Sequence, residues 1–385
     1  MRRFDIPPRP DWPAKVEKWG LTYHTPGGQP YWYESAYYTL DDTDVERIEN
    51  ATNELHRLCL ETVDDLIRTR QIAEFGIPEA AATAMIEDYK GPKGHLYGRF
   101  DLAYDGESEP KLLEYNADTP TALLEAAVVQ WQWSQDRFPG SDQFNSIWEA
   151  LVARWQALSA DGTLPGKIHF AHSDSDEDLL TVSLLRDTAT SAGLRSDGLL
   201  MSDIGWNSDR NTFVDAAEAP IRKLFKLYPW EWLVREDFGE KALLPDMRSI
   251  WIEPMWKMLL SNKALLPILW QRYPGHPNLL PAYFDEPGDL TDFVRKPLFS
   301  REGDGITVVV EGVTQEETPE AEMGPAGFEP RFVYQAVAPL YWTVAGAAVI
   351  GSWVVGDESC GVGIREADGW ITTDTSRFVP HLIQP

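Results

Sequence analysis

The stretch from Tyr97 to Ala127, YGRFDLAYDGESEPKLLEYNADTPTALLEAA, decides how the rest of the chain is interpreted. Two short segments in it, residues 98–104 and 112–116, alternate in character and so place successive side chains on the two faces of a strand. Asp105-Gly106 supplies a turn between them. We therefore expect two neighbouring strands whose shared surface carries Arg99, Asp101, Glu114 and Asn116.

These four side chains suit a site for phosphate and metal. Two carboxylates and an amide oxygen are hard ligands of the kind that Mg²⁺ takes, and Mg²⁺ commonly completes its shell with substrate phosphates. An arginine beside them suits a fork-shaped contact to a phosphoryl group. The structural alternative is a solvated strand face with a salt bridge. On spacing alone that alternative is the more common one, so the choice between the two interpretations depends on the other segments of the chain.

Composition limits the classes of partner. The chain has 385 residues, enough for two or three domains, and its 25% charged and 43% apolar residues are typical of a globular protein. Lys plus Arg number 34 against 61 Asp plus Glu, which gives a net charge of −27. Such a field repels nucleic acid and anionic membranes, so a phosphate site must be a local positive pocket. The same field favours amine-bearing small molecules.

Cysteine usage and apolar runs indicate a cytoplasmic protein. Cys59 and Cys360 are the only cysteines, too few for a disulfide framework. The first residues contain no apolar core of signal-peptide length. The longest apolar run, residues 344–355, is too short to span a bilayer. We expect neither a membrane nor a nucleic-acid partner, and the oligomeric state is left open.

The first half of the chain predicts a helical body followed by a small α/β layer. Residues 1–40 are expected to form an extended arm, and Thr43-Asp44 to cap a helix at 45–71. Further helices are predicted after Pro78, at 123–133 and at 146–158. A strand at 167–172, a helix at 176–192 and a strand at 199–201 then predict an open α/β layer from 166 to 252. That layer has no G-x-G-x-x-G, so no dinucleotide site is expected there.

The second half predicts a hairpin that could cover phosphates. A helix begins near Trp256, and two strands at 293–298 and 306–310 flank a glycine-bearing loop. Lys296 would point in as a charge, and Gly303 would let the backbone approach closely. An ordinary hairpin is the alternative, since no Walker motif is present. An acidic, mobile loop is expected at 311–330, followed by strands at 332–340, 344–355 and 361–366. Arg365 could contact an anion or be a surface arginine.

Seven motifs occur along the chain in one order. They are Y-G-R-F-D-L at 97–102, L-E-Y-N-A-D-T-P-T at 113–121, W-K-M-L-L-S-N-K at 256–263, R-K-P-L-F-S-R-E-G at 295–303, V-Y-Q-A-V-A-P-L at 333–340, G-V-G-I-R-E at 361–366 and T-S-R-F-V-P-H at 375–381. Together they resemble the ATP-grasp module of the glutathionylspermidine synthase family, and most closely its stand-alone acid–amine ligase members.

The resemblance implies an α/β fold of the permuted ATP-grasp type in four parts. Residues 1–165 would hold the arm, helices and metal-site strands, and 166–252 a small pre-ATP-grasp-like domain. Residues 253–310 would form a lid with lysines and the glycine hairpin, and 311–385 the strands that complete the body.

The resemblance also implies a role for each matching position. Asp101, Glu114 and Asn116 would hold two Mg²⁺ ions against ATP, while Arg99 and Arg365 would stabilise charge on the γ-phosphoryl group. Lys257 and Lys296 would bind phosphates. Other nucleotide contacts would come from Phe100, Glu302, Gly303, Gln335, Ala336, Val337, Ala338, Trp370, Ile371 and Thr372, and contacts to the acid from Thr119 and Thr121.

The implied reaction joins a carboxylate to an amine through an acyl phosphate, with ADP as a product. Two departures from the bifunctional members bear on its substrates. This chain has no room for their amidase domain, and it has N-A-D-T-P-T-A at 116–122 where they have N-A-D-S-A-S-C. The acid and the amine, which could be a polyamine, are therefore left open. The alternative function is an ATP-binding protein with a regulatory or scaffolding role and no ligase product.

Overall fold

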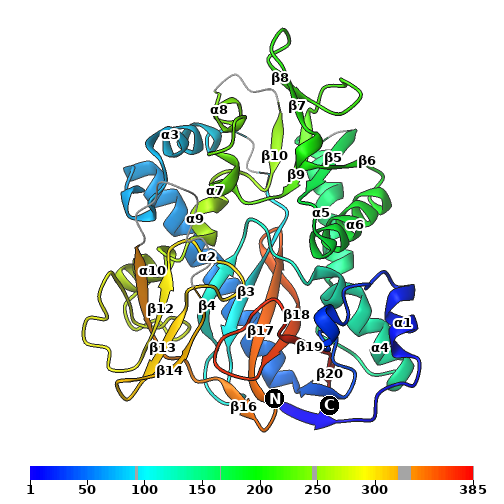
Figure 1. Cartoon of the computed structure of the whole chain (residues 1–385), viewed down its shortest axis with the longest axis vertical. Helices are drawn as coiled ribbons and strands as arrows, with labels where there is room; N and C mark the ends of the chain where they lie inside the picture. Colours follow the sequence, from blue (N-terminus) through cyan, green and yellow to red (C-terminus); the bar gives the residue numbers. More distant parts are fainter. Residues whose placement is uncertain (92–93, 165, 245–248, 320–330, 385) are drawn as a thin grey trace.

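The two strands that carry the cluster pair at the centre of the molecule (Figure 1). The computed structural model describes residues 1–385 apart from 92–93, 165, 245–248, 320–330 and 385. In it β3 (Tyr97–Ala103) and β4 (Lys111–Asn116) are antiparallel, with Arg99 opposite Asn116 and Asp101 opposite Glu114. The sheet continues from β3 through β17 (Gly346–Val355), β18 (Glu358–Ala367) and β19 (Arg377–Val379), and β16 (Tyr341–Thr343) pairs with β17. The predicted strand pair is confirmed.

A long amphipathic helix, α2 (Asp42–Thr69), packs on the face of this sheet that lies away from the cluster (Figure 1). Its buried residues recur at helical spacing, as expected. The predicted cap was wrong by about two residues. Asp41 is the N-cap, because its side chain accepts from the Asp44 amide while the Asp44 carboxylate accepts from the Asp41 amide.

The N-terminal segment contains regular structure, so the prediction of an extended arm was wrong in part. It forms β1 (Arg2–Asp5), α1 (Trp12–Lys18), the short helix η1 (Pro26–Gly28) and β2 (Ala36–Leu40). β2 lies between β1 and the C-terminal β20 (His381–Ile383), which brings the two ends of the chain together (Figure 1). Glu366 of β18 accepts from Arg3 at 2.6 Å and from the Tyr38 hydroxyl at 2.7 Å, and these bonds fasten this sheet to the central one.

The remaining helices of the first half lie close to where the sequence predicts them. They are η2 (Ala73–Phe75), α3 (Glu79–Asp88), α4 (Gln130–Arg137) and α5 (Ile147–Ala160). The helix predicted at 123–133 begins at Leu123 as expected, but it contains the π-helical turn η3 (Glu125–Val129) and runs on to Arg137.

A small parallel sheet forms one end of the molecule (Figure 1). Its order is β10 (Ile250–Ile252), β9 (Lys223–Leu227), β5 (Lys167–His172) and β6 (Arg195–Leu200). Helix α6 (Asp176–Ser191) connects β5 to β6 as predicted, but the second strand ends before Met201, which starts η4 (Met201–Asp203). The hairpin β7 (Gly205–Asn207) and β8 (Thr212–Val214) and the short helices α7 (Trp230–Leu233) and α8 (Gly239–Ala242) complete this layer.

A separate antiparallel sheet lies beside β4 and carries the predicted hairpin (Figure 1). After α9 (Lys257–Ser261) and α10 (Leu265–Arg272), its order is β11 (Ala282–Phe284), β15 (Phe332–Ala336), β12 (Phe293–Pro297), β13 (Thr307–Val310) and β14 (Val313–Glu317). Part of the expected acidic loop is thus strand β14, while 320–330 lie outside the described residues. Because β14 and β15 belong to this sheet, the boundary expected at residue 310 falls inside it.

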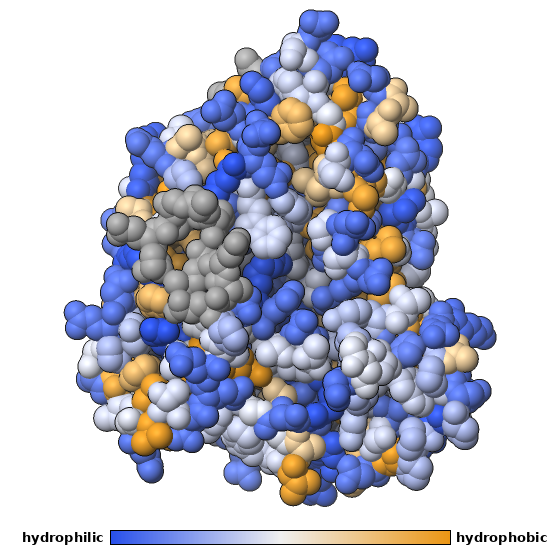
Figure 2. Space-filling model, viewed as in Figure 1, coloured by the Kyte–Doolittle hydropathy of each residue, from blue (hydrophilic) through white to orange (hydrophobic). Residues whose placement is uncertain are grey.

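The surface agrees with the acidic composition. On the face shown in Figure 2, hydrophilic residues predominate and the apolar ones are scattered among them. None of the described helices is long and apolar enough to cross a membrane.

Candidate active site

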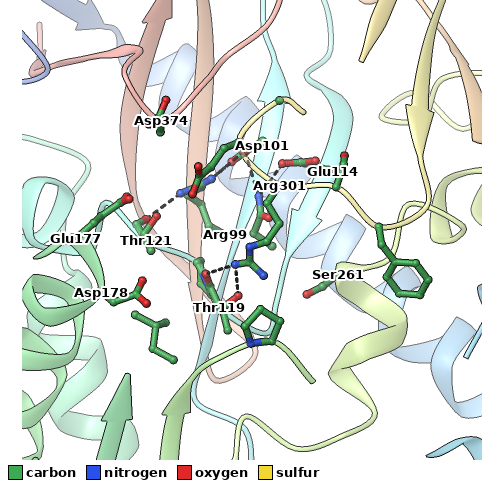
Figure 3. Close-up of a pocket in the computed structure, with 18 of the residues that line it drawn as sticks. Arg99, Asp101, Glu114, Thr119, Thr121, Glu177, Asp178, Ser261, Arg301 and Asp374 are labelled. Carbon is green, nitrogen blue, oxygen red and sulfur yellow. Dashed lines mark hydrogen bonds and ion pairs between the residues drawn. The ribbon is translucent and has the colours of Figure 1, made fainter. Parts of the chain in front are cut away.

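The four cluster residues face a cleft of about 290 Å³ between the central sheet, the small α/β layer and the hairpin loop. Figure 3 shows Glu114 and Ser261 on one side of this cleft, Glu177 and Asp178 on the other, and Arg99 between them. The alternation of β3 and β4 directs these side chains into the cleft, and it directs Phe100 and Tyr115 away from it onto a stacked pair with ring centroids 3.7 Å apart.

Arg99 is fixed in the middle of the cleft. Its Nε donates to Asp101 Oδ1 at 2.6 Å, and its Nη1 donates to the carbonyl oxygen of Thr121 at 2.8 Å. The side chain is 14% exposed, so it reaches the cleft while its stem is packed. The arrangement ties the arginine both to a carboxylate of the cluster and to the loop that follows β4 (Figure 3).

Glu114 lies between the other cluster residues and a pair of lysines. The Asn116 amide donates to Glu114 at 3.0 Å and to Asp101 at 3.2 Å, and Lys263 Nζ lies 3.1 Å from the other Glu114 oxygen. Burial raises the pKa of Glu114, but the charges of Lys263 and Lys296 outweigh burial and hold that pKa at about 2. Burial lowers the pKa of Lys296 to about 8 in spite of Glu114. Lys263 and Lys296 therefore place positive charge at the end of the cleft where Glu114 lies.

The donor set fits Mg²⁺. Asp101 and Glu114 lie opposite each other in the strand register, Asn116 lies beside both, and all three face the cleft. Oxygen ligands in this number match a metal that keeps waters and takes further oxygens from phosphates. Burial raises the pKa of Asp101 even beside Arg99, so a cation that neutralises this pair of carboxylates would relieve their mutual repulsion.

Several expected nucleotide contacts do not line the cleft, and the Lys257 and Phe100 side chains lie away from it. Lys257 is fully buried and lies 2.7 Å from a Glu253 oxygen, and its Nζ also donates to the Tyr97 carbonyl oxygen. Glu253 in turn accepts from the amides of Leu96 and Tyr97, so this ion pair holds the start of β3. The Phe100 side chain packs on Tyr115 on the opposite face, which leaves only its backbone near the cluster.

The hairpin loop closes onto the cleft from the other side. Arg301 donates to the Thr119 hydroxyl (Figure 3). Its second terminal nitrogen lies 3.8 Å from a Glu231 oxygen. Gly303 has φ +81°, and a Cβ there would lie 2.7 Å from the Thr372 carbonyl oxygen, so only glycine allows this contact. Glu302, Gly303 and Thr372 line the cleft as expected, whereas Arg301 was missed although it lies within the motif at 295–303.

The loop after β4 is held in place from two directions. The hydroxyl of Ser261, at the end of α9, accepts from the amides of Ala117 at 3.0 Å and Asp118 at 2.8 Å. The Asp118 carboxylate accepts from Lys226 Nζ at 2.6 Å and from the Trp230 amide at 2.9 Å, and both ion-pair partners are buried. Thr119 and Thr121 therefore enter the cleft on a rigid segment.

Carboxylates gather at the end of the cleft away from the lysines. Figure 3 shows Glu177, Asp178 and Asp374 on this side, and Glu231 also lines it. Glu177 and Asp178 come from the first turn of α6 and Asp374 from the segment after β18. Arg365 lies here as well and donates to the carbonyl oxygens of Thr373 and Ser376. Sequence reasoning missed the carboxylates, because acidic residues at a helix start are common and carry no motif.

The expected nucleotide contacts at 335–338 and at 370–371 lie beside the cleft. Gln335 donates to the Leu112 carbonyl oxygen at 2.8 Å and accepts from Lys296 Nζ at 2.7 Å. Ala336 and Ala338 pack in a small apolar cluster between the hairpin sheet and β3–β4, whose other members are Ala103, Leu113, Leu280 and Leu340. The Trp370 amide donates to Glu316 of β14, while Ile371 packs against Gly303.

Solved structures of low sequence identity share this fold. A glutathione synthetase-like effector of Globodera pallida superposes with a TM-score of 0.59 at 10% identity, and 97% of this chain and 96% of that chain are covered. A structure from Methylobacillus flagellatus titled as a gamma-glutamylcysteine synthetase superposes with a TM-score of 0.51, also at 10% identity, over 86% of this chain and 88% of that one. The fold is thus a mixed α/β fold of the glutathione synthetase-like class.

Sequence comparison narrows this class to a family. The profile described as "Glutathionylspermidine synthase preATP-grasp" matches residues 3–384, and the chain belongs to that family, as its motifs predicted. A protein of Haemophilus influenzae named "Putative acid--amine ligase" is 40% identical over 397 residues, which are 99% of this chain and 98% of that protein.

Two further relatives are longer proteins named as synthetases. The trypanothione synthetase of Crithidia fasciculata is 28% identical over 90% of this chain and 56% of its own length. The bifunctional glutathionylspermidine synthetase/amidase of Escherichia coli is 26% identical over 71% of this chain and 48% of its own length. This chain therefore spans about half the length of each. The names of these relatives are those of ligases and synthetases.

Proposed function

We propose that the protein is an ATP- and Mg²⁺-dependent carboxylate–amine ligase that releases ADP and has a permuted ATP-grasp fold. The observation that carries this proposal is the polarity of the cleft. Arg99, Lys263 and Lys296 surround the oxygen ligands at one end, and carboxylates gather at the other. A nucleotide phosphate and an ammonium group have opposite charges, and this cleft has a place for each.

Lys263 and Lys296 would bind the ATP phosphates at the end of the cleft where Glu114 lies, so Lys263 would have the role that the resemblance implied for Lys257. Asp101, Glu114 and Asn116 would hold Mg²⁺, which neutralises phosphate charge when bound. Arg99 would contact the γ-phosphoryl group, and Arg365 would be a second cation beside the reacting atoms. The apolar cluster around Ala338, with the backbone of residues 335–338, would receive the adenine.

The acid and the amine would meet in the cleft next to Arg99. Thr119 and Thr121, on the rigid loop after β4, would orient the acid together with Arg301. Glu177, Asp178, Glu231 and Asp374 would bind a cationic amine, and several carboxylates in a row suit a di- or polyamine better than a single charge. The acid and amine named for the longer relatives belong to those proteins.

The chemistry then needs positioning and charge neutralisation. A carboxylate oxygen of the acid attacks the γ-phosphorus, the bond from phosphorus to the β-phosphate oxygen breaks, and ADP leaves. The nitrogen of a neutral amino group attacks the acyl carbon and the bond from carbon to the phosphate oxygen breaks. The nitrogen loses one proton, which leaves with inorganic phosphate, and the amide is formed. Arg99 stabilises charge in the first step. The hairpin loop at 299–305 excludes the water that would hydrolyse the acyl phosphate.

Nucleotide binding should take up a proton at Lys296. Its pKa of about 8 is below the ordinary value, so at pH 9 most of this side chain is neutral in the free protein. Phosphate anions raise the pKa, and ATP binding at pH 9 is therefore accompanied by proton uptake, whereas at pH 6.5 the lysine is already charged. Calorimetry in two buffers of different ionisation enthalpy measures this uptake. Equal uptake by Lys296→Gln at pH 9 would assign the proton to another group.

The function itself is tested by ADP release from the purified protein with Mg²⁺ and ATP. A grid of amino acids and small peptides is combined with mono-, di- and polyamines, and every positive well is analysed by mass spectrometry. We expect ADP that depends on one acid and one amine together, with a new mass equal to their sum minus water. Nucleotide binding without stimulation of ADP release in any well would favour an ATP-binding protein that makes no product.

A further inference from the structure

A second cavity, of about 700 Å³, is lined by residues of α2 and α5 and by Asp357, which lies in the turn between β17 and β18. It shares no lining residue with the catalytic cleft among the residues that the structure describes. Its wall includes Asp64, Tyr89, His95, Asp161, Trp256 and Asp357. His56 connects this region to the catalytic strands, because its Nδ1 is 3.0 Å from the hydroxyl of Tyr115 on β4.

The tautomer of His95 follows from its carboxylate neighbour. Nε2 of His95 lies 3.2 Å from Oδ1 of Asp357. A carboxylate oxygen only accepts hydrogen bonds, so Nε2 carries the proton and Nδ1 presents a lone pair. Burial lowers the pKa of His95 to about 4, so the ring is neutral near pH 7. Nδ1 of His95 is therefore a hydrogen-bond acceptor.

This acceptor has no donor in the described part of the chain. The His95 side chain is buried, and its Nδ1 has no hydrogen-bond partner there. His56 provides an internal comparison: its Nε2 lies 3.4 Å from the same Asp357 oxygen, but its Nδ1 accepts from Tyr115. The two imidazoles are arranged alike, and only the one that lines the cavity lacks its donor. A buried acceptor without a partner is costly, so a donor from outside the chain is indicated.

The surroundings of His95 indicate the charge of that donor. Four carboxylates lie on the wall, those of Glu61, Asp64, Asp161 and Asp357. Among the described lining residues, Arg154 is the one arginine or lysine, and its Nε donates to the His95 carbonyl oxygen at 2.9 Å. The rings of Tyr89 and Trp256 pack edge to face with centroids 6.0 Å apart. The Trp256 indole nitrogen is also buried without a described partner, which leaves a place for an oxygen acceptor. Aromatic walls with carboxylates suit an organic ammonium group.

We propose that this cavity is a second ligand site, separate from the catalytic cleft, that binds a small amine whose ammonium group donates to Nδ1 of His95 and faces the wall carboxylates. A hydroxyl or carbonyl oxygen on the same ligand would accept from Trp256. The site does not depend on the reaction proposed for the cleft.

The test observes the imidazole nitrogens of the full chain directly, by NMR of protein labelled with ¹⁵N-histidine. The chain has seven histidines, and the resonance that disappears in His95→Gln identifies this residue. The probe is 4-amino-1-butanol, and 1-butanol, which lacks the ammonium group, is its matched control. We expect a saturable shift of the His95 Nδ1 resonance with the amino alcohol and none with 1-butanol.

Variants locate the binding. Asp64 and Asp161 are exposed, so Asp64→Asn with Asp161→Asn should leave the fold intact and weaken binding by at least about tenfold. Glu177→Gln in the catalytic cleft should leave the His95 shift unchanged. The proposal is overturned by a resonance that does not move at tens of millimolar probe, by an equal response to 1-butanol, or by an unchanged affinity in the double variant.

Discussion

Arg99→Ala should abolish acid- and amine-dependent ADP formation while the protein stays folded. The guanidinium lies between Asp101 and the carbonyl oxygen of Thr121, and an arginine at a transferring phosphoryl group contributes about 10³-fold or more to the rate. Its removal also leaves Asp101 without its ion-pair partner, so the free energy of unfolding should fall by about 1–3 kcal/mol. ADP release under saturating substrates measures the first effect and denaturant unfolding the second.

An exposed arginine gives the matched control for this variant. Arg68 lies near the end of α2 with its side chain 69% exposed, and Arg68→Ala should change ADP formation by less than about twofold. The assignment of Arg99 fails if Arg99→Ala retains ADP formation within about tenfold of the parent protein under the same conditions.

Lys257→Met should destabilise the protein by about 3–5 kcal/mol, because it leaves the carboxylate of Glu253 buried without its cation. Glu253 also accepts from the amides of Leu96 and Tyr97, so the loss should loosen the start of β3. Denaturant unfolding measures the change. Lys18→Met, at an exposed lysine, is the control for removal of one positive charge and should have an effect within about 0.5 kcal/mol.

The comparison of Lys257 with Lys263 separates a structural from a phosphate-binding lysine. Lys263 lies 3.1 Å from Glu114 at the cleft, so Lys263→Met should raise the KM for ATP more than Lys257→Met does. Lys257→Met should lower the free energy of unfolding more than Lys263→Met does. Unchanged unfolding together with a raised KM in Lys257→Met would return Lys257 to the phosphate site that the motif suggested.

The two strands that carry the cluster could be predicted because their information is local. Alternation places Arg99, Asp101, Glu114 and Asn116 on one face regardless of what packs around them. The exact register, with a shift between Asp101 and Leu102 and a connection at 104–110, is seen only in the structure. Two strands of the small parallel sheet, β5 and β6, and the hairpin followed from the same kind of pattern, whereas β9 and β10 were not predicted. The predicted division into four domains stays a prediction, although the sheet that contains β12 to β15 crosses its last boundary.

What could not be predicted depends on contacts between distant segments. Lys257 and Lys263 lie in one motif, and only the packing of α9 shows that the first is paired with Glu253 while the second reaches Glu114. Arg301 is part of the site because it donates to the Thr119 hydroxyl across the cleft, a contact between segments far apart in the sequence. The carboxylates of α6 become part of the site only because the small sheet packs beside Arg99.

The transfer of oxygen from the acid to phosphate tests the central claim most directly. Acids labelled with ¹⁸O in the carboxyl group are incubated with ATP, Mg²⁺ and each amine, and the inorganic phosphate from wells with acid- and amine-dependent ADP is analysed by mass spectrometry. An acyl phosphate requires that one ¹⁸O per turnover moves from the acid to phosphate, and we expect phosphate with one heavy oxygen. Unlabelled phosphate in a well that forms the amide would contradict the acyl phosphate mechanism, and the absence of any acid- and amine-dependent ADP would contradict the ligase itself.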